Sequence, residues 1–284
     1  MRRACHRKGA LTIMPWSIDQ ARQDPARRRL VAELLTQLAD DDLIIGFRDQ
    51  EWLGLAPHIE EDVAFGSIGQ EEIGHAAHFY HLLEELGLGS ADDLASLRPP
   101  QERRNSVLLE QPNGPGHYLE DPHFDWAWTI VRHYAHDVWE MTVLAGLEAS
   151  ALTPLADAAR KILPEKRYHR AHQELWLKTM ARHDDESRAR LIRALLDLKE
   201  WWGDLAGFGE IAPELGPSHL LPSAAQLPDR FHREFRTFFA ALAVDVPAAG
   251  EPRLNGRAGQ HTEALTAALA TLSEVYRLDP KASW

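Results

Sequence analysis

Apolar residues recur at spacings of three and four from about Pro25 onward, and this periodicity constrains the fold more than any other feature of the chain. Such spacing is typical of helices that bury one face. Alternating β-branched patterns are rare, so strands are expected to be nearly absent. The periodicity predicts helices over residues 30–53, 59–86, 124–150, 155–183, 188–205, 231–243 and 262–277.

Short connections predict that the first four of these helices form two antiparallel pairs. Residues 54–57 and 152–154 are long enough only for neighbours that run in opposite directions. The segment between the pairs contains Pro112 and Gly114 among other helix breakers, and it predicts a crossover. We therefore expect an all-α four-helix bundle with additional C-terminal helices, in a single domain over residues 25–284.

The first 24 residues are expected to stand apart from this bundle. Arg2 and Arg3 precede a short apolar stretch at 10–14, which superficially resembles a secretory signal but is too short for one. Met14 could equally be the true start of the chain. Residues 1–24 are therefore predicted to be a disordered leader or a start-site artefact.

Charge and composition exclude several classes of function. The formal net charge is −12, and the basic residues are dispersed except near the start, so neither nucleic acid nor an anionic membrane is an expected partner. Cys5 is the sole cysteine, which excludes disulfides, thiolate zinc sites and iron–sulfur clusters within the chain and indicates a cytoplasmic protein. Apolar runs such as 238–246 are far shorter than the ~20 residues that span a bilayer.

Ionisable residues fall on the predicted helices in the pattern of a di-iron bundle. Such a centre takes one carboxylate from each of two helices and a Glu-x-x-His motif from each of the other two. The motif works because residues at i and i+3 share a helix face. Glu72 and His75 form it on the second helix, and Asp42 lies level with Glu72 on the first. Asp137 lies midway along the third helix.

The fourth helix departs from this pattern. A glutamate is needed three residues before His169, but that position holds Lys166, whose ammonium does not ligate iron. One outcome is that Glu165, four residues before His169, turns into the site. The other is that the Lys166 ammonium takes the second metal's place. We favour the second outcome, because buried carboxylates without compensation are unfavourable.

The resulting prediction is a partial or vestigial metal site, which would hold iron or manganese if it functions at all. Its ligand set is Asp42, Glu72, His75, Asp137, Glu165 and His169. Each of these residues could alternatively be ordinary surface charge, and the run from Asp40 to Asp42 is more often a solvated face. Their similar height along the bundle favours a shared polar core instead. No role is predicted for His133, His136 or His172.

Several motifs resemble the subunits of the phenylacetyl-CoA monooxygenase (1,2-epoxidase) complex of phenylacetate degradation. The motifs are LADDDLIIG (38–46), EWLGLAP (51–57), LLEQPNG (108–114), EKRYH (165–169) and GRAGQHTE (256–263). The last three are similar to the structural, non-catalytic, ferritin-like subunit. Together the motifs extend over nearly the whole chain.

The resemblance implies a ferritin-like partner subunit that pairs with a homologous catalytic di-iron subunit and other oxygenase subunits, in a homo- or hetero-oligomer. Such a complex converts phenylacetyl-CoA to its ring-1,2-epoxide, and the structural subunit is not expected to perform chemistry. Glu72 and His75 match the catalytic subunit's helix-two motif, whereas Lys166 stands where that subunit has its helix-four glutamate. Three hypotheses follow: a non-catalytic subunit, a metal-binding ferritin-like oxygenase or oxidase in its own right, or ferritin-like metal storage. Nothing in the sequence indicates the cage-forming repeat that storage would need.

Overall fold

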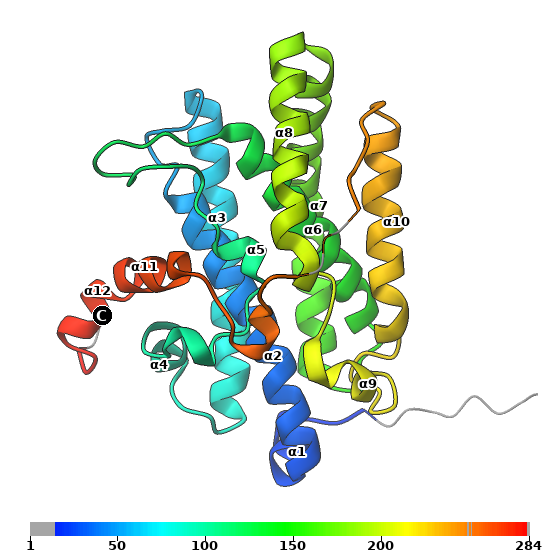
Figure 1. Ribbon diagram of the computed structural model, residues 1–284. Coiled ribbons are helices and arrows are strands. Elements are labelled where there is room, and N and C mark those ends of the chain that lie inside the picture. Colours follow the sequence, from blue (N-terminus) through cyan, green and yellow to red (C-terminus); the bar gives the residue numbers. More distant parts are fainter. Residues whose placement is uncertain (1–14, 249, 251, 283–284) are drawn as a thin grey trace, which may run out of the picture.

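The computed structural model describes residues 15–248, 250 and 252–282, and those residues form helices and no named strand (Figure 1). The bundle consists of α2 (Pro25–Gln50), α3 (Ile59–Glu85), α6 (Trp126–Leu147) and α7 (Thr153–Arg182). α2 packs on α3 and α6 packs on α7, each across a short connection. The predicted all-α four-helix bundle is confirmed.

Additional helices cover two sides of this bundle. α8 (Asp185–Trp201) and α10 (Leu227–Ala240) pack on α6, whereas α11 (Glu263–Leu272) and α12 (Glu274–Leu278) lie on the far side, with α11 against α2 (Figure 1). The short α-helices are α1 (Ile18–Gln23), α4 (Ala91–Ser96), α5 (Val107–Glu110) and α9 (Ala212–Leu215). The 3-10 turns are η1 (Pro100–Glu102), η2 (Trp202–Asp204), η3 (Gly209–Ile211), η4 (Ala224–Gln226) and η5 (Gly256–Ala258). None of the described helices is long and apolar enough to cross a membrane.

Side-chain caps explain where the bundle helices begin. The Asp24 carboxylate accepts hydrogen bonds from the Ala26 and Arg27 amides at 3.0 and 3.2 Å, and Pro25 fills the first helical position. The helix predicted over 30–53 therefore starts five residues earlier, because its arginine-rich first turn has no apolar periodicity. Aspartates cap α6 and α8 in the same way.

The predicted leader and the last predicted helix also differ from the structure. The predicted leader does not extend to residue 24, because Trp16 is buried and its amide donates to the Ala151 carbonyl at 2.8 Å. The part of that leader over residues 1–14 lies outside the described residues. The single helix predicted over 262–277 is divided into α11 and α12 at Ser273, whose hydroxyl donates to the Leu269 carbonyl at 2.6 Å.

Small residues let α2 and α3 approach each other closely. A Cβ atom at Gly69 would lie 3.1 Å from the Gly46 carbonyl oxygen, and one at Gly46 would lie 3.0 Å from Glu72 Cβ. Both contacts are tighter than side chains ordinarily show, so a larger residue at either position would require the neighbouring atoms to shift. The crossing brings the α2 backbone directly beside Glu72.

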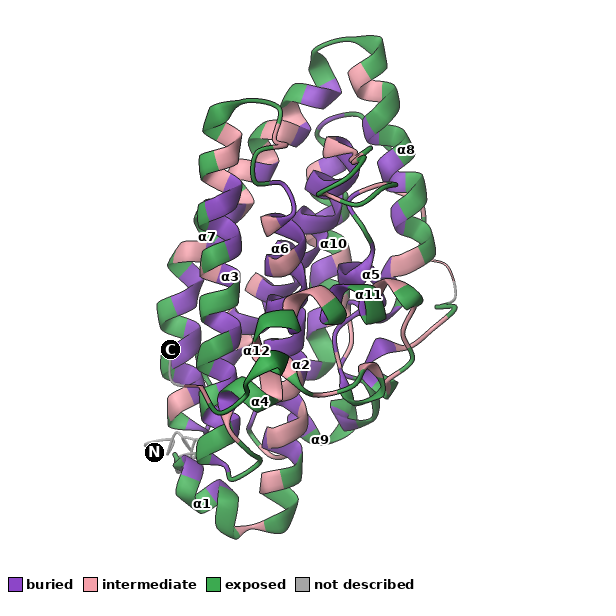
Figure 2. Ribbon diagram, turned by 90° about the vertical axis from the view of Figure 1, so that its left-hand side faces the viewer, coloured by how far each residue is buried: buried purple, intermediate pink, exposed green. Residues whose placement is uncertain are grey.

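The interior of the helical bundle is largely buried (Figure 2). The acidic run on α2 is part of this interior, and it binds distant segments to the bundle. Asp40 accepts hydrogen bonds from the Tyr80 hydroxyl at 2.6 Å and the Arg104 amide at 2.8 Å. Asp41 forms an ion pair with Arg257 at 2.7 Å. The alternative that this run is a solvated face is therefore wrong, and its charges join α2 to the crossover and the C-terminal segment.

A second clamp joins the crossover to the segment that precedes α11. Glu110, in α5, accepts a hydrogen bond from the Thr262 amide at 2.6 Å and lies 2.7 Å from His261 Nδ1. Asn113 donates to the Arg48 carbonyl at 2.7 Å. These contacts fix two long irregular segments against α2.

We expect Arg257→Met to lower the free energy of unfolding by about 3–5 kcal/mol, because it leaves the Asp41 carboxylate buried without its cation. Chemical denaturation measures the loss. The matched control is Arg190→Met, which removes an exposed ion pair with Glu186 and should have no measurable effect. Equal losses in the two variants would contradict a stabilising role for the ion pair between Asp41 and Arg257.

Candidate metal centre

Carboxylates from three helices meet in the interior of the bundle. They are Asp42 of α2, Glu72 of α3, and Asp137 and Glu140 of α6. All four side chains are buried, with at most 3% of any residue exposed. Helical spacing places Glu140 on the same face as Asp137, three residues along. Acidic groups at this depth must either pair with cations or be held protonated.

Lys166 of α7 supplies one of those cations. Its Nζ lies 2.5 Å from Glu72 Oε1 and 2.7 Å from Asp137 Oδ1. The same atom lies 2.6 Å from Glu140 Oε2, and the residue is fully buried. The amine therefore points into the carboxylate cluster and away from solvent.

The ion pair between Lys166 and Glu72 keeps both of these side chains charged. Burial alone would lower the pKa of Lys166, but the surrounding carboxylates outweigh burial and hold it well above its usual value. Burial alone would raise the pKa of Glu72, and the ammonium outweighs it and holds that pKa well below its usual range. Asp42, which Lys166 does not contact at ion-pair distance, behaves differently: burial and the Glu140 carboxylate raise its pKa to about 8.

Two histidines of α6 extend the cluster. His133 Nε2 lies 2.8 Å from Asp49 Oδ2, and its Nδ1 lies 3.1 Å from Asp137 Oδ2. His136 Nε2 lies 3.2 Å from Glu140 Oε2. Burial alone would lower the pKa of His136, but its carboxylate neighbours raise it to about 10.

Two further histidines connect the cluster to the surface between α3 and α7. His75 Nδ1 faces Glu72 Oε2 at 3.5 Å, and its Nε2 lies 2.6 Å from Glu165. His169 Nδ1 lies 3.2 Å from Glu72 Oε1, and its Nε2 lies 2.6 Å from Glu71. Each ring is thus held between an interior carboxylate and a half-exposed outer one.

The structure brings together most of the predicted ligand set. The residues found in or against the cluster are Asp42, Glu72, His75, Asp137 and His169. Glu165 does not enter it: its side chain is 41% exposed and contacts only the outer nitrogen of His75. Whether any metal binds these residues stays a prediction.

Sequence reasoning missed Glu140 and gave no role to His133 or His136. A signal was present, because ionisable residues at 133, 136, 137 and 140 mark one face of an otherwise apolar helix. His172, also left without a role, lies 2.6 Å from Glu61 near the surface.

Comparison with known proteins identifies the family. The sequence matches the family described as phenylacetic acid catabolic protein over residues 14–284. The chain belongs to this family. It is also 30% identical, over 249 residues, to one subunit of the 1,2-phenylacetyl-CoA epoxidase of Escherichia coli K12, in an alignment that covers 87% of this chain and 96% of that relative. The predicted resemblance is confirmed.

The cluster does not fit a two-metal centre of the kind found in ferritin-like oxygenases. Such a centre needs a second Glu-x-x-His, whose carboxylate reaches the metal pair. In this member of the phenylacetic acid catabolic family, an ammonium stands at that position and lies among three carboxylates. A cation bound there would meet the positive charge of Lys166 directly.

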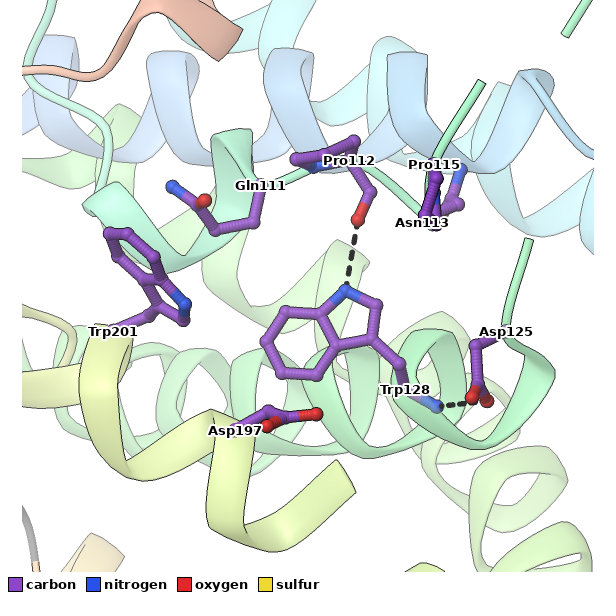
Figure 3. Close-up of a pocket in the computed structure, with 9 residues that line it drawn as sticks. Gln111, Pro112, Asn113, Pro115, Asp125, Trp128, Asp197 and Trp201 are labelled. Atoms are coloured by element: carbon purple, nitrogen blue, oxygen red, sulfur yellow. Dashed lines mark hydrogen bonds between the residues drawn. The ribbon is translucent and has the colours of Figure 1, made fainter. Parts of the chain in front are cut away.

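A surface pocket lies outside the cluster and shares no residue with it. Its volume is about 330 Å³, and it lies where the crossover meets α6 and α8 (Figure 3). The Trp128 indole donates to the Pro112 carbonyl at 2.9 Å, and Asp125 caps α6 (Figure 3). The Trp128 indole thus holds the crossover against α6, whereas the Asp125 carboxylate is used to cap that helix.

We expect Lys166→Met to lower the free energy of unfolding by about 3–5 kcal/mol, because it removes the cation shared by three buried carboxylates. Denaturant titration of metal-free protein measures the loss. The control is Lys178→Met, which removes a half-exposed ion pair with Glu174 from the same helix. A Lys166→Met variant as stable as this control would contradict the assigned role.

The stability of the chelator-treated protein should fall as pH rises above about 6.5. His136 has its pKa raised from 6.5 to about 10, so its stabilising contribution is complete below 6.5 and is lost on passing through 10. Thermal unfolding between pH 6 and 10 measures the slope. His136→Gln should flatten it, whereas His123→Gln, at an exposed position, should leave it unchanged. A slope that His136→Gln does not alter would contradict the assignment.

Proposed function

We propose that this chain is the structural partner subunit of a multicomponent oxygenase that converts phenylacetyl-CoA to its ring-1,2-epoxide in phenylacetate catabolism. The similarity to a subunit of the Escherichia coli epoxidase, over most of both chains, supports this proposal. The chain pairs with a homologous catalytic di-iron subunit in the cytoplasm. It does not itself carry out the oxygenation.

The observation that carries the non-catalytic role is the position of Lys166. Its ammonium is fully buried and lies within 2.7 Å of an oxygen of Glu72, Asp137 and Glu140. A di-iron oxygenase needs those carboxylates to hold two metal ions. Here a side chain of the protein supplies a positive charge among those same carboxylates, at the position where a metal ion would otherwise lie.

The alternative function is an oxygenase in its own right, supported by the Glu72 and His75 motif. Lys166 weighs against it, because di-iron chemistry requires both metal positions. Glu165, the only predicted replacement for the missing helix-four glutamate, is 41% exposed and contacts the outer side of His75. The alternative is therefore not favoured.

Reconstitution tests the proposal. The chain, a catalytic homologue and their reductase are purified and assayed for oxygen consumption and epoxide formation, separately and together. We expect a stable complex of the two homologous chains, full activity only in the mixture, and none from this chain with reductase alone. The proposal would be contradicted if this chain with reductase alone oxidised phenylacetyl-CoA. It would also be contradicted if the two homologous chains failed to associate.

A variant of the catalytic partner tests the reasoning from Lys166. Replacing that partner's helix-four glutamate with lysine should abolish epoxide formation and remove at least one metal ion, while the complex with this chain still forms. A fully active lysine variant would show that the ammonium does not prevent the chemistry.

A further inference from the structure

The surface pocket between the crossover and α8 is lined by acceptors and aromatic rings. Its walls come from crossover residues 111–115, from the start of α6 and from the C-terminal half of α8 (Figure 3). Among its nine described lining residues, two are aspartates, two are tryptophans, and none is a lysine or an arginine. The pocket therefore presents negative charge and aromatic surface without a cation of its own.

Gln111 contributes an acceptor that the described part of the chain does not use. The residue is 7% exposed, and its side-chain amide nitrogen donates to the Val107 carbonyl at 2.8 Å. That hydrogen bond fixes which end of the amide is the oxygen. No group of the described residues donates a hydrogen bond to this oxygen, although Gln111 lines the pocket. The oxygen is therefore available to a donor that enters from outside the chain.

Two tryptophans form the aromatic part of the wall. Trp128 belongs to α6 and is 9% exposed, whereas Trp201 ends α8 and is half-buried (Figure 3). The Trp128 indole N–H already donates to the Pro112 carbonyl, so what Trp128 offers to the pocket is its ring. Among aromatic side chains, tryptophan attracts a cation over its face most strongly.

Asp197 of α8 gives the pocket an unbalanced negative charge. Within the described residues, it forms no ion pair. Burial is the largest cause that raises the pKa of Asp197, and the nearby Arg193 guanidinium opposes it. The carboxylates of Asp125 and Glu200 raise the same pKa further. The negative charges around Asp197 thus outweigh the one cation near it.

A guanidinium group matches this combination of groups better than other cations do. It is planar, it stacks on aromatic faces, and its five N–H donors point outward in the plane. It can therefore lie against an indole ring while its edges donate to the Asp197 carboxylate and to Gln111 Oε1. An ammonium is a point charge with three donors and does not stack in this way.

The size and the surroundings of the pocket indicate that the guanidinium belongs to a polypeptide. A volume of about 330 Å³ lies at the low end of the range for ligand pockets, which suits one side chain. Beside Asp197, α8 exposes Ile192 and Leu196, which are one turn apart and 41% and 55% exposed. A small free cation would leave both residues in water. The formal net charge of −12 also favours a partner with a basic surface.

We propose that this pocket binds the guanidinium of an arginine side chain that a partner polypeptide presents. The guanidinium stacks on the tryptophan rings and donates to Asp197 and Gln111 Oε1, and apolar residues beside that arginine cover Ile192 and Leu196. The site is separate from the buried carboxylate cluster, and it depends neither on metal binding nor on the proposed role in an oxygenase.

Fluorine NMR of the full-length chain labelled with 5-fluorotryptophan tests the proposal. The probe is the peptide Leu-Arg-Leu with blocked ends, and Trp128→Phe and Trp201→Phe assign the two signals. We expect saturable binding with a Kd of about 1 mM or tighter, and shifts confined to these two of the nine tryptophans. The peptide with citrulline, a neutral analogue of arginine, should bind at least ~10-fold more weakly.

Matched variants locate the bound arginine. Asp197→Asn should weaken binding about 10-fold, because it removes the charge that pairs with the guanidinium. Asp185→Asn makes the same change at an exposed position in the first turn of α8, outside the pocket, and should leave the affinity unchanged. Circular dichroism confirms that each variant is folded.

A second comparison distinguishes a polypeptide from a small cation. Leu196→Ser should weaken binding of the peptide roughly 3–10-fold through lost apolar contact, and it should not change binding of ethylguanidinium. Equal affinities of the peptide and ethylguanidinium, both unaffected by Leu196→Ser, would make the ligand a small cation and overturn the proposal.

Three other results would also overturn it. The first is the absence of any shift at Trp128 and Trp201 when the peptide is added to folded protein. The second is equal affinity for the arginine peptide and for its citrulline or lysine counterpart. The third is an equal loss of affinity in Asp197→Asn and Asp185→Asn, which would show non-specific attraction to an acidic surface.

Discussion

Buried carboxylates cannot be left without cations, and this electrostatic requirement organises the interior of the bundle. Glu72 comes from α3, Asp137 and Glu140 from α6, and the ammonium of Lys166 joins them from α7. Because the attraction between close charges is strong at this depth, the ion pairs fix the relative heights of three helices. The close crossing at Gly46 and Gly69 then brings α2 against the same cluster.

The motifs that carry the family resemblance are largely clamps, and this explains why they extend far from the cluster. Asp41 binds Arg257, and Glu110 binds the backbone of Thr262, so the α2 motif, the crossover motif and the C-terminal motif all contact one another. Irregular segments expose many backbone groups, and charged side chains at fixed positions are an efficient way to satisfy them.

A single residue separates the two functional interpretations of the cluster. With glutamate at position 166, α7 would carry a second Glu-x-x-His motif beside the one on α3, whereas lysine places a fixed positive charge among Glu72, Asp137 and Glu140. The fold is compatible with either arrangement, since a fold does not determine chemistry. The proposed partner role depends on the position of this one ammonium.

The sequence alone determined the four bundle helices, their pairing, and the inward placement of Asp42, Glu72 and Lys166, because helical periodicity and short connections fix the height and face of a residue. Only the tertiary structure decided which neighbours each charge meets. The helix spacing does not say that Glu140 faces Lys166, or that Glu165 stays outside against His75. These side-chain contacts depend on the distances between helices, which arise from packing between segments far apart in the chain.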